Sequence, residues 1–101
     1  MRAAISIDRE KLGALCRRHH IRRLSLFGSV LRPDFRPESD VDVLVEFEPG
    51  KVPGFLTLYD IEAELSKLLD GREVDLVTRQ SLNRRLRDRV LASAQVEYAA
   101  G

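Results

Sequence analysis

The segment from Asp40 to Phe47 alternates between two kinds of side chain, and this alternation constrains the fold more than any other feature of the chain. Successive residues of a β-strand point to opposite faces of a sheet, so this segment predicts a strand with one apolar face and one mostly acidic face. The apolar face must pack against other elements, whereas the carboxylates require water or a cation. The apolar face carries Val41, Val43, Val45 and Phe47, and the other face carries Asp40, Asp42, Leu44 and Glu46.

Helical and strand patterns alternate along the rest of the chain. Apolar residues at helical spacing, with capping residues at the ends, indicate three helices, and two further apolar alternations indicate strands. A sheet with an open carboxylate face needs helices on its other face only. The sequence therefore predicts an α/β (α+β) fold with three main strands and with helices packed on one face. The predicted order is helix 8–19, strand 22–27, a short turn after Gly28, strand 41–47, helix 57–70, strand 73–78 and a last helix from Ser81 through Ala94.

Length and composition predict one domain over residues 1–101 and exclude several classes of protein. A chain of 101 residues with 44% hydrophobic side chains can bury a core. Its 17 basic and 16 acidic residues leave a formal charge of +1, so no overall field favours nucleic acid or a membrane. The single cysteine, Cys16, excludes an internal disulfide and is expected to be a small buried residue. We expect a cytoplasmic protein with no membrane association and no direct nucleic-acid binding.

Acidic residues form the first half of a candidate site. Asp40 and Asp42 are about 6.6 Å apart along one face of a strand. Magnesium is commonly held by one or two carboxylates together with substrate phosphates, so this pair is a candidate metal site. Asp75 lies mid-strand on the face opposite Val74 and Leu76. If its strand pairs beside that of Asp42, three carboxylates share one face and could hold two metal ions for phosphoryl transfer.

Gly28 and Ser29 form the second half of the candidate site. A strand that ends in glycine lets a phosphate approach the backbone, and the first amides of the following turn attract negative charge. The Ser29 hydroxyl and the Arg32 guanidinium could add donors to a triphosphate. The chain lacks the GxxxxGK[ST] pattern, so this is a different solution from a P-loop.

Ordinary structural roles compete with the functional interpretation. A DxD pair at the start of a strand is common by itself, but its fixed distance from Gly28-Ser29 and the presence of Asp75 favour a nucleotide site. Tyr59 and Glu62 lie on a helix whose apolar stripe packs on the sheet, which favours structural roles for both. For the arginines of the last helix, a solvated face is favoured over an RNA-binding or toxin-binding patch. These arginines are Arg84, Arg85, Arg87 and Arg89.

Gly28-Ser29, ten intervening residues and Asp40-Val41-Asp42 resemble the GSx10DxD signature of the polymerase-beta-type nucleotidyltransferase superfamily. The whole length resembles the minimal single-domain branch, the antitoxin-type nucleotidyltransferases encoded beside HEPN-domain toxins. The likeness covers residues 24–47 most strongly, extends to strand 73–78 and includes residues 88–90. It implies a palm-like mixed sheet.

The resemblance also implies a role for each residue of the motif. Asp40 and Asp42 would hold the metal ions, two Mg²⁺ in number. Asp75 would be the third carboxylate, a metal ligand that helps to activate the acceptor hydroxyl. Gly28 and Ser29 would bind the triphosphate of ATP.

In the antitoxin branch, AMP passes from ATP to a tyrosine of the partner HEPN toxin, which silences a ribonuclease. One departure from the family pattern exists, because Leu31-Arg32-Pro33 stands where relatives have a small residue, arginine and glycine. Pro33 removes one amide near the phosphates.

Two other functions remain open from the sequence. The chain could neutralise a toxin by stoichiometric binding, with a vestigial nucleotide site, because so short a chain has little room for an acceptor-binding domain. It could also be a free-standing nucleotidyltransferase that acts on a small molecule or RNA, although the short chain argues against this.

Overall fold

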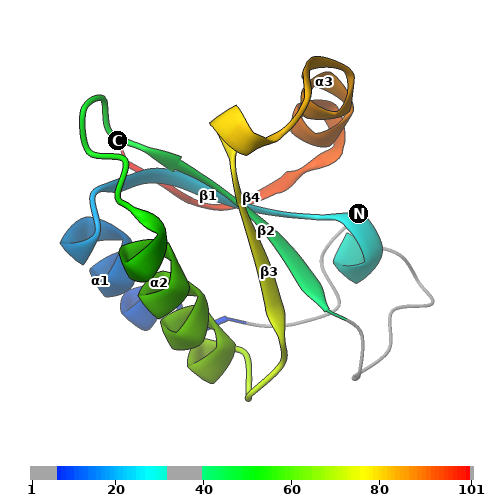
Figure 1. Cartoon of the computed structure of the whole chain (residues 1–101). Helices are drawn as coiled ribbons and strands as arrows, with labels where there is room; N and C mark the ends of the chain where they lie inside the picture. The colour runs from blue at the N-terminus through cyan, green and yellow to red at the C-terminus, as the bar shows by residue number, and fades with distance from the viewer. Residues whose placement is uncertain (1–6, 32–39, 101) are drawn as a thin grey trace.

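The computed structural model describes residues 7–31 and 40–100 of the chain. Within these residues it contains three α-helices, four β-strands and two 3-10 helices (Figure 1). The α-helices are α1 (Arg9–Arg18), α2 (Phe55–Leu68) and α3 (Arg84–Ser93), and the 3-10 helices are η1 (Gly28–Leu31) and η2 (Arg79–Ser81). The strands are β1 (Ile21–Phe27), β2 (Val41–Phe47), β3 (Val74–Thr78) and β4 (Gln95–Ala99).

The four described strands form one mixed sheet in the order β3-β2-β1-β4. Strand β1 pairs antiparallel with both β2 and β4, whereas β2 pairs parallel with β3. A parallel pair needs a crossover connection, and α2 supplies it between β2 and β3. The α/β class and the mixed sheet are therefore confirmed.

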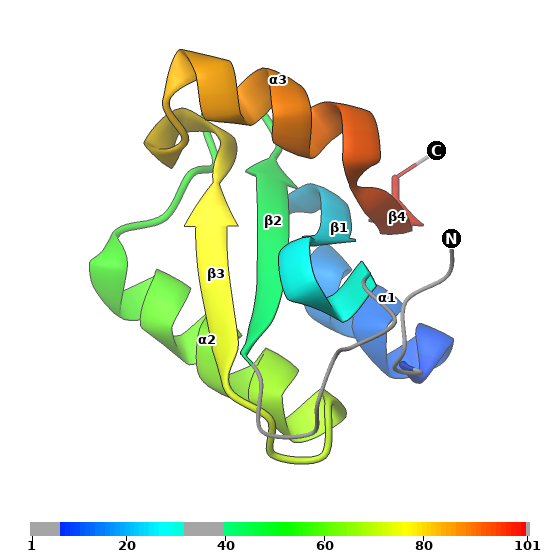
Figure 2. The same ribbon diagram turned by 90° about the vertical axis from the view of Figure 1, so that its right-hand side faces the viewer.

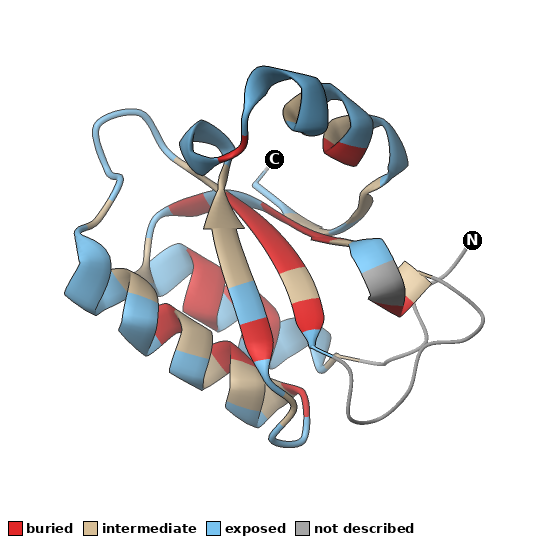
Figure 3. Ribbon diagram, turned by 45° about the vertical axis from the view of Figure 1, so that its right-hand side comes forward, coloured by how far each residue is buried: buried red, intermediate tan, exposed pale blue. Residues whose placement is uncertain are grey.

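The main core lies between the sheet and the helices α1 and α2 (Figures 1 and 3). Val41, Val43 and Val45 of β2 are fully buried in it, as their alternation predicts. Ile61 and Leu65 of α2 belong to the same core. Burial of each such side chain stabilises the fold by about 1.5–3 kcal/mol, so this core fixes which face of β2 points toward the helices.

Helix α3 packs on the opposite face of the sheet from α1 and α2 (Figure 2). Leu44 points to that face and forms a second apolar cluster with Leu82 and Val90. The prediction that all helices pack on one face is therefore wrong for α3. The physical reason is that Leu44, with Phe27 and Val77, makes an apolar patch on the otherwise acidic face, and α3 covers this patch.

Strand β4 is an element that the sequence pattern did not predict. It follows directly after α3 and pairs with β1, which adds a fourth strand to the three main ones. Its five residues show no regular alternation of buried and exposed positions. The backbone pairing with β1, rather than its own apolar pattern, therefore defines this strand.

The N-terminal cap of α1 is the predicted residue, whereas that of α3 is not. Asp8 caps α1 as predicted, because its side chain accepts hydrogen bonds from two first-turn amides. Ser81 does not cap α3. Its hydroxyl and amide instead bond Thr78 within η2, and Asn83 caps α3 by accepting from the Leu86 amide at 2.9 Å.

No helix in the described part of the chain is both long and apolar enough to cross a membrane. Cys16 is fully buried in the main core, as predicted for the single cysteine.

The first testable prediction concerns Cys16. Burial raises the pKa of its thiol to about 12, and the thiolate is the reactive form. We expect a thiol reagent such as DTNB to leave the native protein unlabelled near pH 8 and to label one thiol per chain after denaturation with guanidinium chloride. Rapid stoichiometric labelling of the native protein would contradict the packing of α1 on the sheet.

Candidate functional site

The pairing of β2 with β3 places Asp42 and Asp75 side by side. The two residues are partners in the parallel register, between the pairs Val41–Val74 and Val43–Leu76. Paired residues of neighbouring strands point to the same face of a sheet, so both aspartates lie on the face opposite the main core. The predicted pairing of the strand of Asp75 with that of Asp42 is therefore confirmed.

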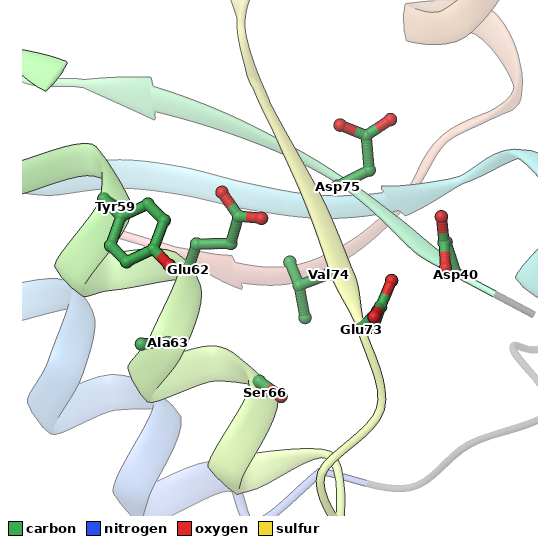
Figure 4. Close-up of a pocket in the computed structure, with 8 residues that line it drawn as sticks. All are labelled: Asp40, Tyr59, Glu62, Ala63, Ser66, Glu73, Val74 and Asp75. Atoms are coloured by element: carbon green, nitrogen blue, oxygen red, sulfur yellow. The ribbon is translucent and has the colours of Figure 1, made fainter. Parts of the chain in front are cut away.

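Asp40 precedes β2 by one residue and extends the same acidic row. In Figure 4 its side chain lies on the same side of β3 as that of Asp75. The two residues line a cavity of about 430 Å³ that also reaches Glu73 and Glu62. The structure thus brings two of the three predicted carboxylates into one cavity and sets the third, Asp42, beside Asp75 in the sheet.

Gly28 lies directly against the carboxylate of Asp42. It has a left-handed backbone conformation with φ of +75°, which favours glycine. A Cβ built on Gly28 would overlap the Oδ2 atom of Asp42 and would lie only 3.2 Å from its Cγ atom. Glycine therefore satisfies two requirements here, because it permits the turn into η1 and leaves room for the Asp42 side chain.

Two predicted nucleotide ligands are described only in part or not at all. Ser29 lies in η1, immediately after Gly28, but its side chain is outside what the structure describes. Arg32 and Pro33 lie outside the described residues. The roles of Ser29 and Arg32 therefore stay predictions.

The metal site predicted from three carboxylates needs a closer description. Among residues 7–31 and 40–100, no three His, Cys, Asp or Glu side chains are grouped so that they could hold one metal ion. The predicted meeting of Asp40, Asp42 and Asp75 at one point is thus not seen. Magnesium commonly takes one or two carboxylates plus substrate phosphates. The carboxylates of Asp42 and Asp75, at paired positions of β2 and β3, are oxygen ligands of the kind that such an ion takes when it arrives with a nucleotide.

Glu62 is part of the cavity although the sequence pattern indicates only a structural role for it. It projects from α2 toward β3 (Figure 4). Burial raises the pKa of its carboxyl, and the negative charges of Asp75 and Glu73 raise it further. The pattern of α2 alone could not reveal this proximity, because the crossover from β2 to β3 creates it.

A comparison with known protein families identifies the family of this chain. Residues 8–97 match the family model described as a nucleotidyltransferase domain. The chain belongs to this family. It is a nucleotidyltransferase, and the Gly-Ser and Asp-x-Asp positions lie inside the matched region.

Relatives in sequence place the chain in one branch of the family. A candidate protein adenylyltransferase of Methanocaldococcus jannaschii, MJ0435, is 38% identical over 86 residues, which are 85% of this chain and 89% of the relative. Protein adenylyltransferase MntA of Thermococcus cleftensis is 42% identical over 65 residues, which are 64% of this chain and 63% of MntA.

Solved structures share the fold. A candidate minimal nucleotidyltransferase matches with a TM-score of 0.70 and 42% identity over 85% of each chain. A toxin-antitoxin structure with AMP-PNP matches with a TM-score of 0.73 and 22% identity, covering 93% of this chain and 75% of that chain. A complex of a tri-AMPylated Shewanella oneidensis HEPN toxin with its MNT antitoxin matches with a TM-score of 0.64 and 22% identity, covering 91% and 70%. At this lower identity, the last two matches show the fold of this nucleotidyltransferase.

The second prediction compares two glycine substitutions. Gly28 and Gly50 share a φ of +75°, but no atom would lie within 4 Å of a Cβ on Gly50. We expect both Gly28→Ala and Gly50→Ala to lose roughly 1–2 kcal/mol of stability from the left-handed conformation, and Gly28→Ala to lose more because its Cβ would overlap Asp42. Only Gly28→Ala should also displace Asp42 and weaken ATP binding, by tenfold or more, as measured by calorimetry with magnesium. Equal ATP affinity in the two variants would contradict the contact between Gly28 and Asp42.

The third prediction concerns the charge of Glu62. Its pKa is raised from the ordinary value of 4.5, so the charged form is disfavoured in the folded state. Above the raised pKa, Glu62→Gln removes repulsion from Asp75 and Glu73 and should raise the Tm in the absence of metal. Below 4.5 the wild-type carboxyl is neutral, so the gain should disappear. Asp60→Asn on the exposed side of α2 is the control and should give no such pH-dependent gain.

Proposed function

We propose that this nucleotidyltransferase transfers AMP from ATP to a hydroxyl, that of a tyrosine, on a HEPN-type partner protein. The observation that carries the proposal is the parallel register that sets Asp75 beside Asp42, with Gly28 packed against Asp42. In this proposal Asp75 would be the base for the acceptor, beside carboxylates that would serve the nucleotide. In this proposal residues 1–101 act as one nucleotidyltransferase domain in the cytoplasm, where ATP is available.

The names of similar proteins support both the reaction and the partner. The relative from Thermococcus cleftensis is named a protein adenylyltransferase. One structural neighbour is a toxin-antitoxin structure with the ATP analogue AMP-PNP, and another pairs an MNT antitoxin with an AMPylated HEPN toxin. Transfer of AMP to a protein accounts for these names together.

The nucleotide would bind at the corner between β1 and β2. The amides that follow Gly28 at the start of η1, together with the side chains of Ser29 and Arg32, would bind its phosphates. Asp40 and Asp42 would hold magnesium, with Asp75 as a further ligand. Bound magnesium would neutralise phosphate charge and so favour departure of pyrophosphate.

The transfer itself needs one base and one leaving group. The oxygen of the acceptor hydroxyl attacks the α-phosphorus of ATP, and its proton passes to the carboxylate of Asp75. The bond between the α-phosphorus and the oxygen that leads to the β-phosphorus breaks, and pyrophosphate leaves. The products are the AMP ester of the acceptor and pyrophosphate, so atoms and charges balance without another reactant.

The fourth prediction tests this function directly. The protein is incubated with α-labelled ATP, magnesium and the HEPN-type protein encoded by the neighbouring gene, and label on that protein is measured. Asp42→Asn should reduce the labelling rate by about 100-fold or more, because removal of an electrostatic contact to the transition state commonly costs this much. Asp88→Asn, on exposed helix α3, is the matched control and should label at the wild-type rate.

Two outcomes would argue against the proposal. Equal labelling rates for wild type and Asp42→Asn would show that the Asp42 carboxylate takes no part in the reaction. Full neutralisation of the toxin by Asp42→Asn at an equal molar ratio would instead favour a binding module whose catalysis is vestigial.

A further inference from the structure

A groove follows the outer edge of strand β3, between that strand and helix α2. Two adjoining cavities form it, of about 430 Å³ and 560 Å³, and they share Tyr59 and Glu62. One end reaches Asp75 and Asp40, and the other end reaches Thr78. We call this feature the β3-edge groove. It connects the proposed catalytic carboxylate with the exposed surface around Phe55 and Thr78.

One end of the β3-edge groove is apolar and exposed. The side chains of Phe55 and Tyr59 are 91% and 72% exposed, and Leu56 beside them is also exposed. Large apolar side chains gathered at one place on a surface are typical of contacts with other proteins. Aromatic residues in particular act as anchors at such contacts.

The other end of the β3-edge groove is acidic. Asp40, Glu62, Glu73 and Asp75 line it (Figure 4). Like charges gathered at one end of a groove repel one another. A positively charged side chain of a partner would relieve that repulsion.

Strand β3 itself has a free side. It is an edge strand of the described sheet and pairs only with β2 among the described strands. An edge strand can accept an extended segment of another protein as an added strand. The groove and the edge therefore run along the same element toward Asp75.

We propose that the β3-edge groove docks the acceptor segment of the partner protein in an extended conformation. This proposal rests on the proposed function, since it assigns the surface that delivers the hydroxyl to Asp75. An apolar side chain of the segment contacts Phe55 and Tyr59, and a basic side chain contacts Glu62 and Glu73. The five residues of β3 span about 16 Å, so the apolar anchor and the hydroxyl are separated by about three to five residues of the segment.

The fifth prediction tests the docking surface by substitution at its exposed end. We expect the double variant Phe55→Ser/Tyr59→Ser to bind the neighbouring HEPN-type protein at least tenfold more weakly, as measured by calorimetry. Its affinity for ATP with magnesium should be unchanged, because neither residue belongs to the nucleotide corner. Val96→Ser on β4, at the other edge of the sheet, is the matched control, since Val96 is 48% exposed and should leave binding of the partner unchanged. Tyr59→Phe keeps the ring without its hydroxyl and should also bind normally.

Hydrogen exchange gives an independent readout. The amides of β3 should exchange more slowly in the complex than in the free protein, whereas those of β4 should not change. Unchanged partner binding by the double variant would overturn the proposal, and so would β3 amides that gain no protection.

The experiments can reject the proposed reaction and the proposed docking surface independently of each other. Partner binding that is lost in the double variant, together with no AMP transfer by wild type, would reject the reaction and support the surface. AMP transfer that survives the double variant at the wild-type rate would support the reaction and reject the surface.

Discussion

Parallel pairing of β2 with β3 holds two carboxylates at directly paired positions, where like charges destabilise a sheet. The opposite face of the same strand sets this position, because Val41, Val43 and Val45 are fully buried against α1 and α2. A shift of the register by one residue would turn the valines toward water and the aspartates toward the core. Hydrophobic burial on one face therefore determines the geometry of the charged face, and a bound cation would reduce the repulsion there.

One face of the sheet stabilises the fold, and the other face carries the candidate site. Helix α3 covers the apolar patch around Leu44, in the middle of β2, and does not cover the start of that strand or of β3. The acidic cavity lies at this open start, next to the turn at Gly28. A second complete layer of helices would bury the carboxylates, so the site requires that α3 cover only part of this face.

Individual residues show which features the sequence pattern predicted and which it missed. The alternation around Asp42 predicted the central strand, the helical spacing predicted α1 and α2, and the Gly-Ser and Asp-x-Asp spacing indicated the family. The pattern did not reveal β4, whose formation depends on its partner β1. It also assigned Leu44 to an open face, because alternation describes one strand at a time and cannot say which distant helix returns to cover it. Glu62 was missed for the same reason, since only the crossover through α2 brings it near Asp75.

The sequence by itself determined the local elements, the nucleotidyltransferase family and the residue types that can bind a nucleotide, because strand alternation, capping and motif spacing are properties of neighbouring residues. Only the tertiary structure decided that Gly28 packs on Asp42, that Asp75 pairs with Asp42 and that a groove leads along β3 to the carboxylates. These contacts join segments separated by loops and a helix. Their geometry follows from the packing of the whole core, which no single segment encodes.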